Sequence, residues 1–568
     1  MNRRHIATLL TLIATLLTPP DAFPQSVPPP AARTTFLEND HLRLDISLNG
    51  GAIRTAALRR HADTLAHRKD PAAHPYLFNT DGVLPALALS IDDTRGTPVE
   101  WALPFAIVEN HPRQRLVLAA RLTNGVTITR TYTLTSDSSK RDPHVIDVKT
   151  TFRAGDTPAP ALTLRLNTGT LPPVEGDTQH QFLGIATYDG SDFSKTSLSE
   201  FIASSGTLGI GAHEAKAFDL RQRGEKPWQW ISVTNQYFAG ILRLDEPTRH
   251  LAVNLRVSPL YKRTPAGTPQ AYTATGDIAF ALPPLAPHAE ITLGAEYYVG
   301  PREYSRLAAL GGGQEKAVQF AKLFWIISVD LLCKLFVITL DWLHTLLPEI
   351  AGAWGLAIIS LTIIIKALTW PLVTKQQRSA ERMRQFQGPM KALREKHKND
   401  PKRLQQEMMN LYREHRINPF AGCLPVLIQI PIFTGLFFTF QSLAQLRFQS
   451  FLWIPDLSMP DIIPGLEHIA GIPLHILPLF MGVTMWLNMR LTPMPNVEGQ
   501  QKIIFYGMML LFPILCYAMP AALMLYYSVQ NILSIFQTLI LRRRYHTQPT
   551  PTPAALPQTH VHKSKKRR

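Results

Sequence analysis

The stretch that decides the fold is Ile503–Leu541, which reads IIFYGMMLLFPILCYAMPAALMLYYSVQNILSIFQTLIL and carries no charged side chain over 39 residues. As one helix it would be about 59 Å long, roughly twice the hydrocarbon thickness of a bilayer. The run must therefore fold back on itself, and Pro513 and Pro520 bracket the expected turn. We predict two membrane spans here, at about 503–518 and 521–541.

Three further apolar runs precede this stretch, and they predict spans at about 351–374, 420–446 and 468–489. Residues 417–541 hold only 7 charged side chains in 125 positions, which is too few for a soluble domain of that size. The full length of 568 residues indicates at least two folding units. The fold class predicted for residues 351–541 is therefore a polytopic α-helical membrane protein.

Basic residues are concentrated on one side of these spans. Residues 375–416 carry 12 basic and 5 acidic side chains, and residues 542–568 carry 8 basic and no acidic ones, out of a net charge of +16. By the positive-inside rule both segments, together with 490–502, are cytoplasmic, and the loop 447–467 is outside. Attraction of the basic segments to ribosomal RNA is a second interpretation.

The N-terminal residues 1–20 form either a short anchor span or a signal peptide. Arg3 and Arg4 precede an apolar run, Ile6–Thr18, whose 13 residues make a helix of only about 20 Å. No clear cleavage site follows, so both interpretations stay open. Either an anchor or a signal peptide would place the Pro-rich linker 21–33 and the residues after it outside the cytoplasm.

Residues 34–305 predict a large all-β domain outside the cytoplasm. Apolar residues alternate with polar ones in several short runs, and Asn124-Gly125 between two of them is a strong hairpin signal. This pattern is typical of antiparallel sheets packed as a sandwich. The domain contains no His-Glu-x-x-His, Gly-x-Ser-x-Gly or P-loop motif, and the spacing of the cysteines of the chain fits no metal site. We therefore expect no enzymatic activity, no cofactor and no metal.

Two amphipathic segments flank the first span of the core. In residues 314–350 charged residues interrupt an apolar pattern, which predicts a helix lying in the membrane interface; a soluble helix packed on the β domain is the alternative. Residues 378–416 predict a helical hairpin with its turn at Asn399-Asp400-Pro401. The hairpin is either a simple connection or a contact surface.

Polar side chains recur inside the predicted spans. Lys366 is the only ionisable residue of 351–374, and Thr362 and Thr369 share its helix face. The other spans contribute Gln429 and a stripe of Tyr527, Asn531, Ser534 and Thr538. Two interpretations remain: a shared hydrophilic groove open to the cytoplasm, or snorkelling of Lys366 and ordinary helix–helix hydrogen bonds. Because three spans have polar faces, we favour the groove.

These residues resemble the YidC/Oxa/Alb3 family of membrane protein insertases. The most specific match is Asn418–Pro431, NPFAGCLPVLIQIP, supported by Trp370-Pro371-Leu372 and Leu525-Tyr526-Tyr527. The N-terminal part more loosely resembles the periplasmic domain of the Gram-negative branch, through Asn235-Gln236-Tyr237-Phe238 and Tyr298-Val299-Gly300-Pro301.

The resemblance implies a five-span insertase core plus an N-terminal anchor in a bacterial inner membrane, both termini in the cytoplasm and a periplasmic supersandwich domain. It implies that the chain inserts and helps to fold newly made inner-membrane proteins, alone or with the Sec translocon. Lys366 would be the groove cation, where the family usually has Arg. The expected groove comprises Lys366, Thr362, Gln429, Tyr527, Asn531 and Ser534, and the apolar slide beside it comprises Phe433, Phe437 and Met508.

The partners implied are nascent membrane proteins, the Sec translocon, membrane lipid and the ribosome, the last through 375–416 and 542–568; we expect no DNA. A small-solute transporter or channel is the main alternative, although we find no inverted repeat in the sequence. An envelope-sugar-binding membrane protein is a further one, since sandwiches of this type can resemble sugar epimerases.

Overall fold

The computed structural model describes residues 33–546 apart from internal gaps. These gaps are 81–83, 93–97, 136–140, 175–176, 178–181, 202–218, 223–226, 247–249, 261–270, 319–328, 348–349, 351, 386, 399, 415–423, 464, 466–467, 470–471, 492–506 and 508–510. The predicted anchor 1–20, nearly all of the linker 21–33 and most of the basic tail 542–568 lie outside the described residues. Much of the predicted span 503–518, including Met508, lies outside them too.

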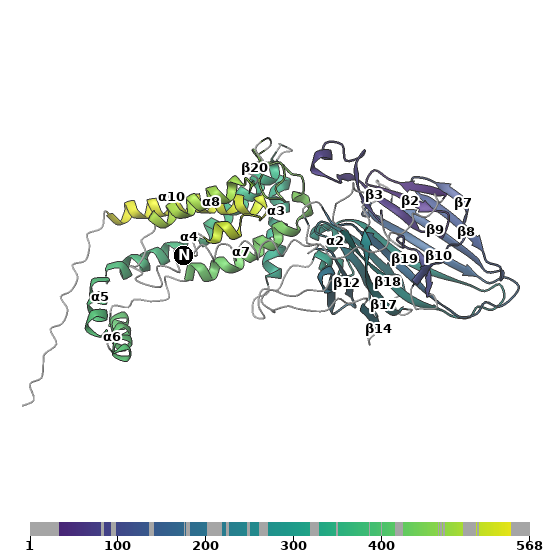
Figure 1. Cartoon of the computed structure of the whole chain (residues 1–568), viewed down its shortest axis with the longest axis horizontal. Helices are drawn as coiled ribbons and strands as arrows, with labels where there is room; N and C mark the ends of the chain where they lie inside the picture. Colours follow the sequence, from purple (N-terminus) through teal and green to yellow (C-terminus); the bar gives the residue numbers. More distant parts are fainter. Residues whose placement is uncertain are drawn as a thin grey trace, which may run out of the picture. The chain divides into compact units, whose positions relative to one another are not determined.

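The chain divides into two compact units (Figure 1). The first comprises the residues up to Ile338 together with Gly435–Gln449, and the second comprises Thr339–Thr434 and the residues from Ser450 onward. Sequence analysis did not anticipate that Gly435–Gln449, at the end of a predicted span, would pack with the β domain.

Three antiparallel sheets build the first unit. The first has four strands in the order β1 (Thr34–Glu38), β2 (Leu42–Ser47), β3 (Ile53–Ala62), β4 (Pro75–Phe78). The second has nine, in the order β13 (Phe193–Ser197), β12 (Gly184–Tyr188), β15 (Trp230–Thr234), β16 (Phe238–Leu244), β19 (Glu290–Pro301), β10 (Val145–Arg153), β9 (Thr127–Leu134), β8 (Arg115–Arg121), β7 (Ala106–His111). The third has six, in the order β14 (Asp219–Gln222), β17 (His250–Leu260), β18 (Ala271–Leu282), β11 (Leu162–Leu171), β5 (Leu89–Asp92), β6 (Pro98–Glu100).

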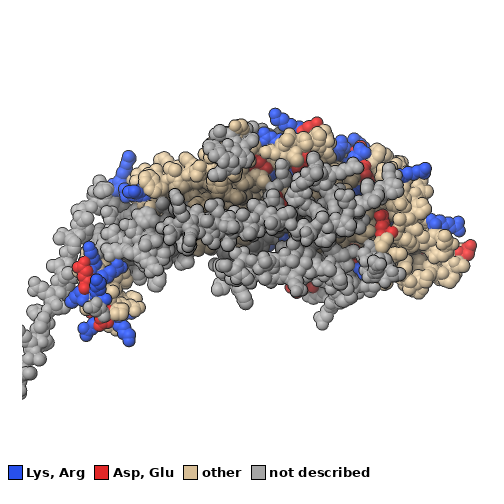
Figure 2. Space-filling model, viewed as in Figure 1, with Lys and Arg blue, Asp and Glu red and all other residues tan. Residues whose placement is uncertain are grey.

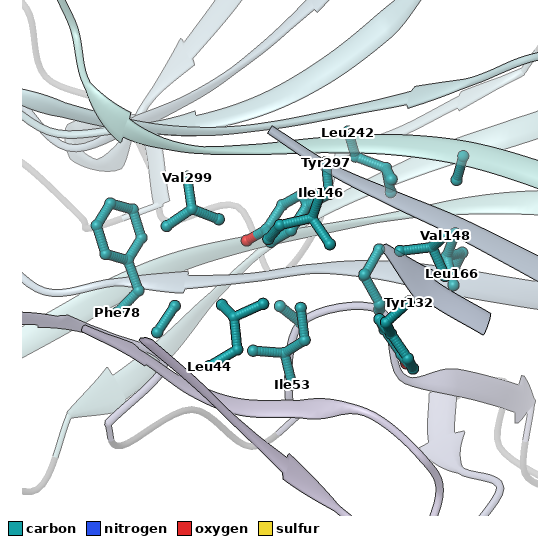
Figure 3. Close-up of a cluster of buried hydrophobic side chains, with 14 of the residues drawn as sticks. Leu44, Ile53, Phe78, Tyr132, Ile146, Val148, Leu166, Leu242, Tyr297 and Val299 are labelled. Atoms are coloured by element: carbon teal, nitrogen blue, oxygen red, sulfur yellow. The ribbon is translucent and has the colours of Figure 1, made fainter. Parts of the chain in front are cut away.

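The alternation read from the sequence explains the core of this unit. In β9 every second side chain is buried, as expected for a strand with one face on the core. Figure 3 shows the side chains that meet there, including Leu44 of β2, Tyr132 of β9, Leu166 of β11 and Tyr297 of β19. The predicted hairpin is confirmed, since β8 pairs with β9 and Gly125 has a φ of +81°. The all-β class predicted for this part of the chain is also confirmed.

A helical segment follows the last strand. It contains α2 (Tyr304–Leu310), a short 3₁₀ helix (Gln314–Val318) and α3 (Asp330–Leu346). One face of α3 is buried, and the Cys333 thiol there donates to the Gly435 carbonyl at 3.4 Å. Large apolar side chains on its other face are more than half exposed: Leu331, Leu335, Ile338, Trp342 and Leu346. An exposed apolar stripe favours the predicted interfacial helix.

The helices of the membrane part are α4 (Ala353–Gln385), α5 (Gln387–Lys396), α6 (Pro401–Glu414), α7 (Leu424–Ser442), α8 (Ile476–Leu491) and α10 (Ala521–His546). Two of them, over Ala353–Lys375 and Ala521–Arg543, are long and apolar enough to cross a membrane within the described residues; Ile476–Leu491 is apolar but shorter. α6 begins at Pro401, where the Asp400 side chain accepts from the Arg403 N–H at 3.1 Å, as the predicted turn requires.

Two boundaries differ from the sequence prediction. α4 continues through 374 to Gln385, because the residues after Pro371 include no helix breaker. The predicted span 468–489 begins too early, since β20 (His468–Ile469) and β21 (Ile472–Pro473) form a small hairpin and α8 starts only at Ile476. The start of α8 is set by Asp461, whose carboxylate accepts from the N–H groups of Ile476 at 2.8 Å and Leu477 at 3.0 Å.

Candidate substrate groove

Lys366 lies on α4 and points toward α10. Its ammonium donates to the Ser534 hydroxyl at 2.7 Å, and the residue is only 3% exposed. Thr362, one turn earlier, is fully buried and donates to the Ile358 carbonyl of its own helix. The structure therefore brings together two of the predicted groove residues, Lys366 and Ser534, from segments 168 residues apart.

A polar seam continues along α4 and α10 beyond this pair. The Gln537 side-chain amide donates to the Trp370 carbonyl and to the Thr374 hydroxyl, each at 3.2 Å. The Gln377 amide donates to the Thr538 hydroxyl at 3.1 Å. Sequence analysis included Thr538 in its stripe but missed Gln537. Its position three residues after Ser534, on the same side of the helix, was the signal that could have identified it.

Asn531 bonds to α8 rather than to α4. Its amide donates to the Thr484 hydroxyl of α8 at 3.3 Å, and Thr484 is 6% exposed. Asn531 therefore joins α10 to α8, while Ser534 joins α10 to α4. The sequence held no signal for Thr484, because a single threonine in an apolar helix commonly bonds its own backbone.

Three buried polar atoms of α10 have no hydrogen-bond partner in the described structure. They are the Ser528 hydroxyl, the Gln530 carbonyl oxygen and the Gln537 carbonyl oxygen. In an apolar environment each would cost about 1 to 3 kcal/mol. Water or a polar peptide backbone that entered between the helices would satisfy them.

The apolar residues predicted beside the groove lie on α7. Phe433 is half-buried, with its ring 5.5 Å from the Tyr527 ring and 5.8 Å from that of Phe512. Phe437, one turn later, is half-buried against Phe438. Gln429 is half-buried one turn before Phe433. Tyr527, a predicted groove residue, thus contacts Phe433 of the predicted slide.

Charged side chains gather at one end of the helical part. Figure 2 shows basic and acidic side chains together over the α5–α6 hairpin, and a basic group at the end of α10. The surface over the rest of α10 carries neither kind in this view. Among the described residues no group of three His, Cys, Asp or Glu side chains could hold a metal ion.

Comparison with known proteins matches both parts of the chain. Residues 35–332 match the family described as YidC periplasmic domain, and residues 346–548 match the family described as 60Kd inner membrane protein. The chain is 30% identical over 532 residues to the membrane protein insertase YidC of Bordetella avium, covering 91% of this chain and 84% of the relative. It is also 30% identical over 522 residues to that of Cupriavidus taiwanensis, covering 90% of this chain and 83% of the relative.

Among solved structures, one described as an active YidC insertase with its first transmembrane domain resolved matches 96% of this chain and 99% of its own. The sequence identity is 16% and the TM-score 0.34.

Proposed function

This chain belongs to the YidC family of membrane protein insertases, and from that premise we propose that it inserts newly made proteins into the inner membrane through a polar groove between α4, α7 and α10. Its relatives are named as insertases, which favours this function over a solute transporter or a sugar-binding protein. Family membership also makes it an inner-membrane protein whose β domain is periplasmic.

The observation that carries the proposal is the environment of Lys366. A cation inside a membrane segment is costly unless it meets polar groups or water. Lys366 bonds to Ser534, and the same helix carries buried polar atoms without partners. A groove hydrated from the cytoplasm satisfies those atoms and leaves the ammonium able to attract an acidic substrate residue.

Insertion of a substrate through such a groove needs no nucleotide. A charged residue at the centre of a bilayer costs about 2.5 to 3.5 kcal/mol, so a short acidic segment faces a barrier of several such terms. A groove that admits water across half of the membrane shortens that path. The apolar helix of the substrate then partitions into lipid beside Phe433 and Phe437, and this partition drives insertion.

The topology and partners follow from the charge distribution. Both termini and the α5–α6 hairpin lie in the cytoplasm, where 375–416 and 542–568 can contact the ribosome through phosphate attraction. α3 lies in the outer interface with its exposed apolar face toward lipid. The chain acts alone or together with the Sec translocon.

Cysteine accessibility tests the groove. Single cysteines at positions 362, 366 and 534 are placed in a chain whose Cys333, Cys423 and Cys516 are replaced by serine. A membrane-impermeant thiol reagent added from the cytoplasmic side is expected to label these positions. Ile363, which is 51% exposed at the same depth as Thr362, provides the control: a cysteine there faces lipid and stays unlabelled. Protection of all three groove positions would rule out the groove.

A second experiment tests insertion directly. A photo-crosslinking amino acid at position 433 is expected to capture nascent membrane proteins during translation. The matched control is position 479 on α8, where Leu479 is 51% exposed but not part of the slide. Equal crosslinking from both positions would show that contact reflects general exposure in the membrane rather than a specific substrate path.

A further inference from the structure

A basic cavity of about 380 Å³ lies within the first unit, and none of the groove residues lines it. One wall is the end of β3 and the loop after it, with Arg60, His61, Arg68 and Lys69. The other is the segment that follows α7, with Gln445 and Arg447. Its volume falls in the range of small-ligand sites.

The charge of the lining is of one sign. Arg60, Arg68, Lys69 and Arg447 contribute four cations, and the described lining includes no Asp or Glu. Within the described part of the chain neither Arg60 nor Lys69 forms an ion pair. Burial, followed by the nearby charges of His144 and Arg447, lowers the pKa of His61 to about 3, so its imidazole is neutral at physiological pH and can still hydrogen-bond. Such a lining attracts anions.

Arg447 is fixed in position by contacts within the unit. Its guanidinium donates to the Ala62 carbonyl at 2.7 Å and to the Asp63 carbonyl at 2.8 Å, and the residue is 8% exposed. It also lies 4.0 Å from the centre of the Phe448 ring. These two carbonyl acceptors hold the guanidinium in a fixed place in the cavity wall.

Gln445 supplies a second recognition element. Its side-chain carbonyl oxygen is buried and has no hydrogen-bond partner in the described structure. A buried acceptor of this kind is satisfied by a donor on the ligand, such as a hydroxyl group. The cavity thus combines cations for a phosphate with an acceptor for a hydroxyl.

The position of residues 444–449, which follow α7, indicates where such a ligand comes from. Ala444 follows the end of α7 at Ser442 by two residues. The 19 residues of α7 give a helix of about 28 Å, close to the thickness of the hydrocarbon core. Residues directly after a span of that length lie at the level of the lipid headgroups, on the outer side in the topology proposed above.

We propose that this cavity binds the phosphoglycerol headgroup of an anionic phospholipid in the outer leaflet. The phosphate lies among Arg60, Lys69 and Arg447, and a glycerol hydroxyl donates to Gln445. The proposal rests on the proposed topology but not on the groove, so a failure of insertion and a failure of lipid binding are separable.

The test measures binding of short-chain phosphatidylglycerol to the full-length protein in a neutral detergent, by calorimetry. Arg60 and Arg68 are exposed and can be replaced without disturbing the core, as can Lys69. The double variant Arg60→Gln/Lys69→Gln is expected to weaken binding by about thirtyfold, because two lipid-attracting charges are lost. The matched control Arg121→Gln/Lys149→Gln removes the same charge from exposed positions on β8 and β10 and should bind like the parent.

Binding of other ligands shows whether the cavity recognises a lipid headgroup, free phosphate or an acidic peptide. Short-chain phosphatidylcholine should bind at least about tenfold more weakly than phosphatidylglycerol, because its headgroup carries no net charge. The Gln445→Leu variant should lose the preference for phosphatidylglycerol over phosphatidic acid, which lacks the glycerol hydroxyls. Equal loss in the control variant, equal binding of phosphatidylcholine, or displacement of the lipid by inorganic phosphate or an acidic peptide at the same concentration would overturn the proposal.

Discussion

Replacing Lys366 by Gln removes the charge of the groove while keeping its polar contact. A glutamine is one bond shorter but keeps an N–H donor toward Ser534, so the pairing of α4 with α10 should survive. A substrate carboxylate that passes beside Ser534 comes within about 5 Å of the ammonium, and at an effective dielectric constant of about 20 the attraction is about 3 kcal/mol. Its loss corresponds to about a hundredfold slower insertion.

The assay compares two substrates in proteoliposomes that contain the purified protein. One carries a single Asp in its translocated segment, and the other carries Asn at the same place. Lys366→Gln should slow the Asp substrate by about a hundredfold and leave the Asn substrate within about threefold of the parent, whereas Lys366→Arg should insert both normally. If both substrates slow equally, or if Ser534→Ala reproduces the effect, the role of Lys366 is to hold the helices together and the electrostatic argument is wrong.

Three further changes test contacts elsewhere in the structure. Burial alone would raise the pKa of Asp142, but the His144 hydrogen bond and the Arg306 charge lower it to about 2. The ionised carboxylate therefore stabilises the fold above pH 4, and this stabilisation is lost as the pH falls toward 2. Asp142→Asn should lower the free energy of unfolding by about 2 kcal/mol in urea titrations at pH 7, and by clearly less at pH 2.5. Asp461→Ala removes the acceptor at the start of α8 at a cost of about 1 kcal/mol, which hydrogen exchange would show as faster exchange at the first turn of α8, while unchanged rates would contradict the assignment. At Gly355 a methyl group would overlap the Phe451 ring, so Gly355→Ala should lower the melting temperature and a second change, Phe451→Ala, should partly restore it; no rescue would point to another cause.

Features that depend on local patterns could be predicted from the sequence. The alternation in β9, the Asn124-Gly125 turn and the Pro401 helix start depend on neighbouring residues alone, and the structure has each of them. The polar stripe on α10 was predicted for the same reason, since a helix face is a matter of spacing.

Features that depend on distant partners could not be predicted. α8 begins where it does because Asp461 accepts from its first N–H groups, which no hydropathy pattern reveals. Arg447 begins the loop that was predicted only to lie outside, yet it donates to carbonyls 385 and 384 residues earlier in the chain. Likewise the sequence placed Asn531 and Ser534 on one stripe but could not show that they bond to different helices.

The unbroken course of α4 has a mechanical consequence. Its 33 residues make a rod of about 50 Å, which exceeds the hydrocarbon core by about 20 Å and continues toward the α5–α6 hairpin. A load applied to that hairpin would be delivered along the helix to the turn that holds Lys366. Pro371, which deprives the rod of one backbone hydrogen bond, is the point where such a load would bend it. Binding at the α5–α6 hairpin and displacement of Lys366, five residues before Pro371, would then be coupled.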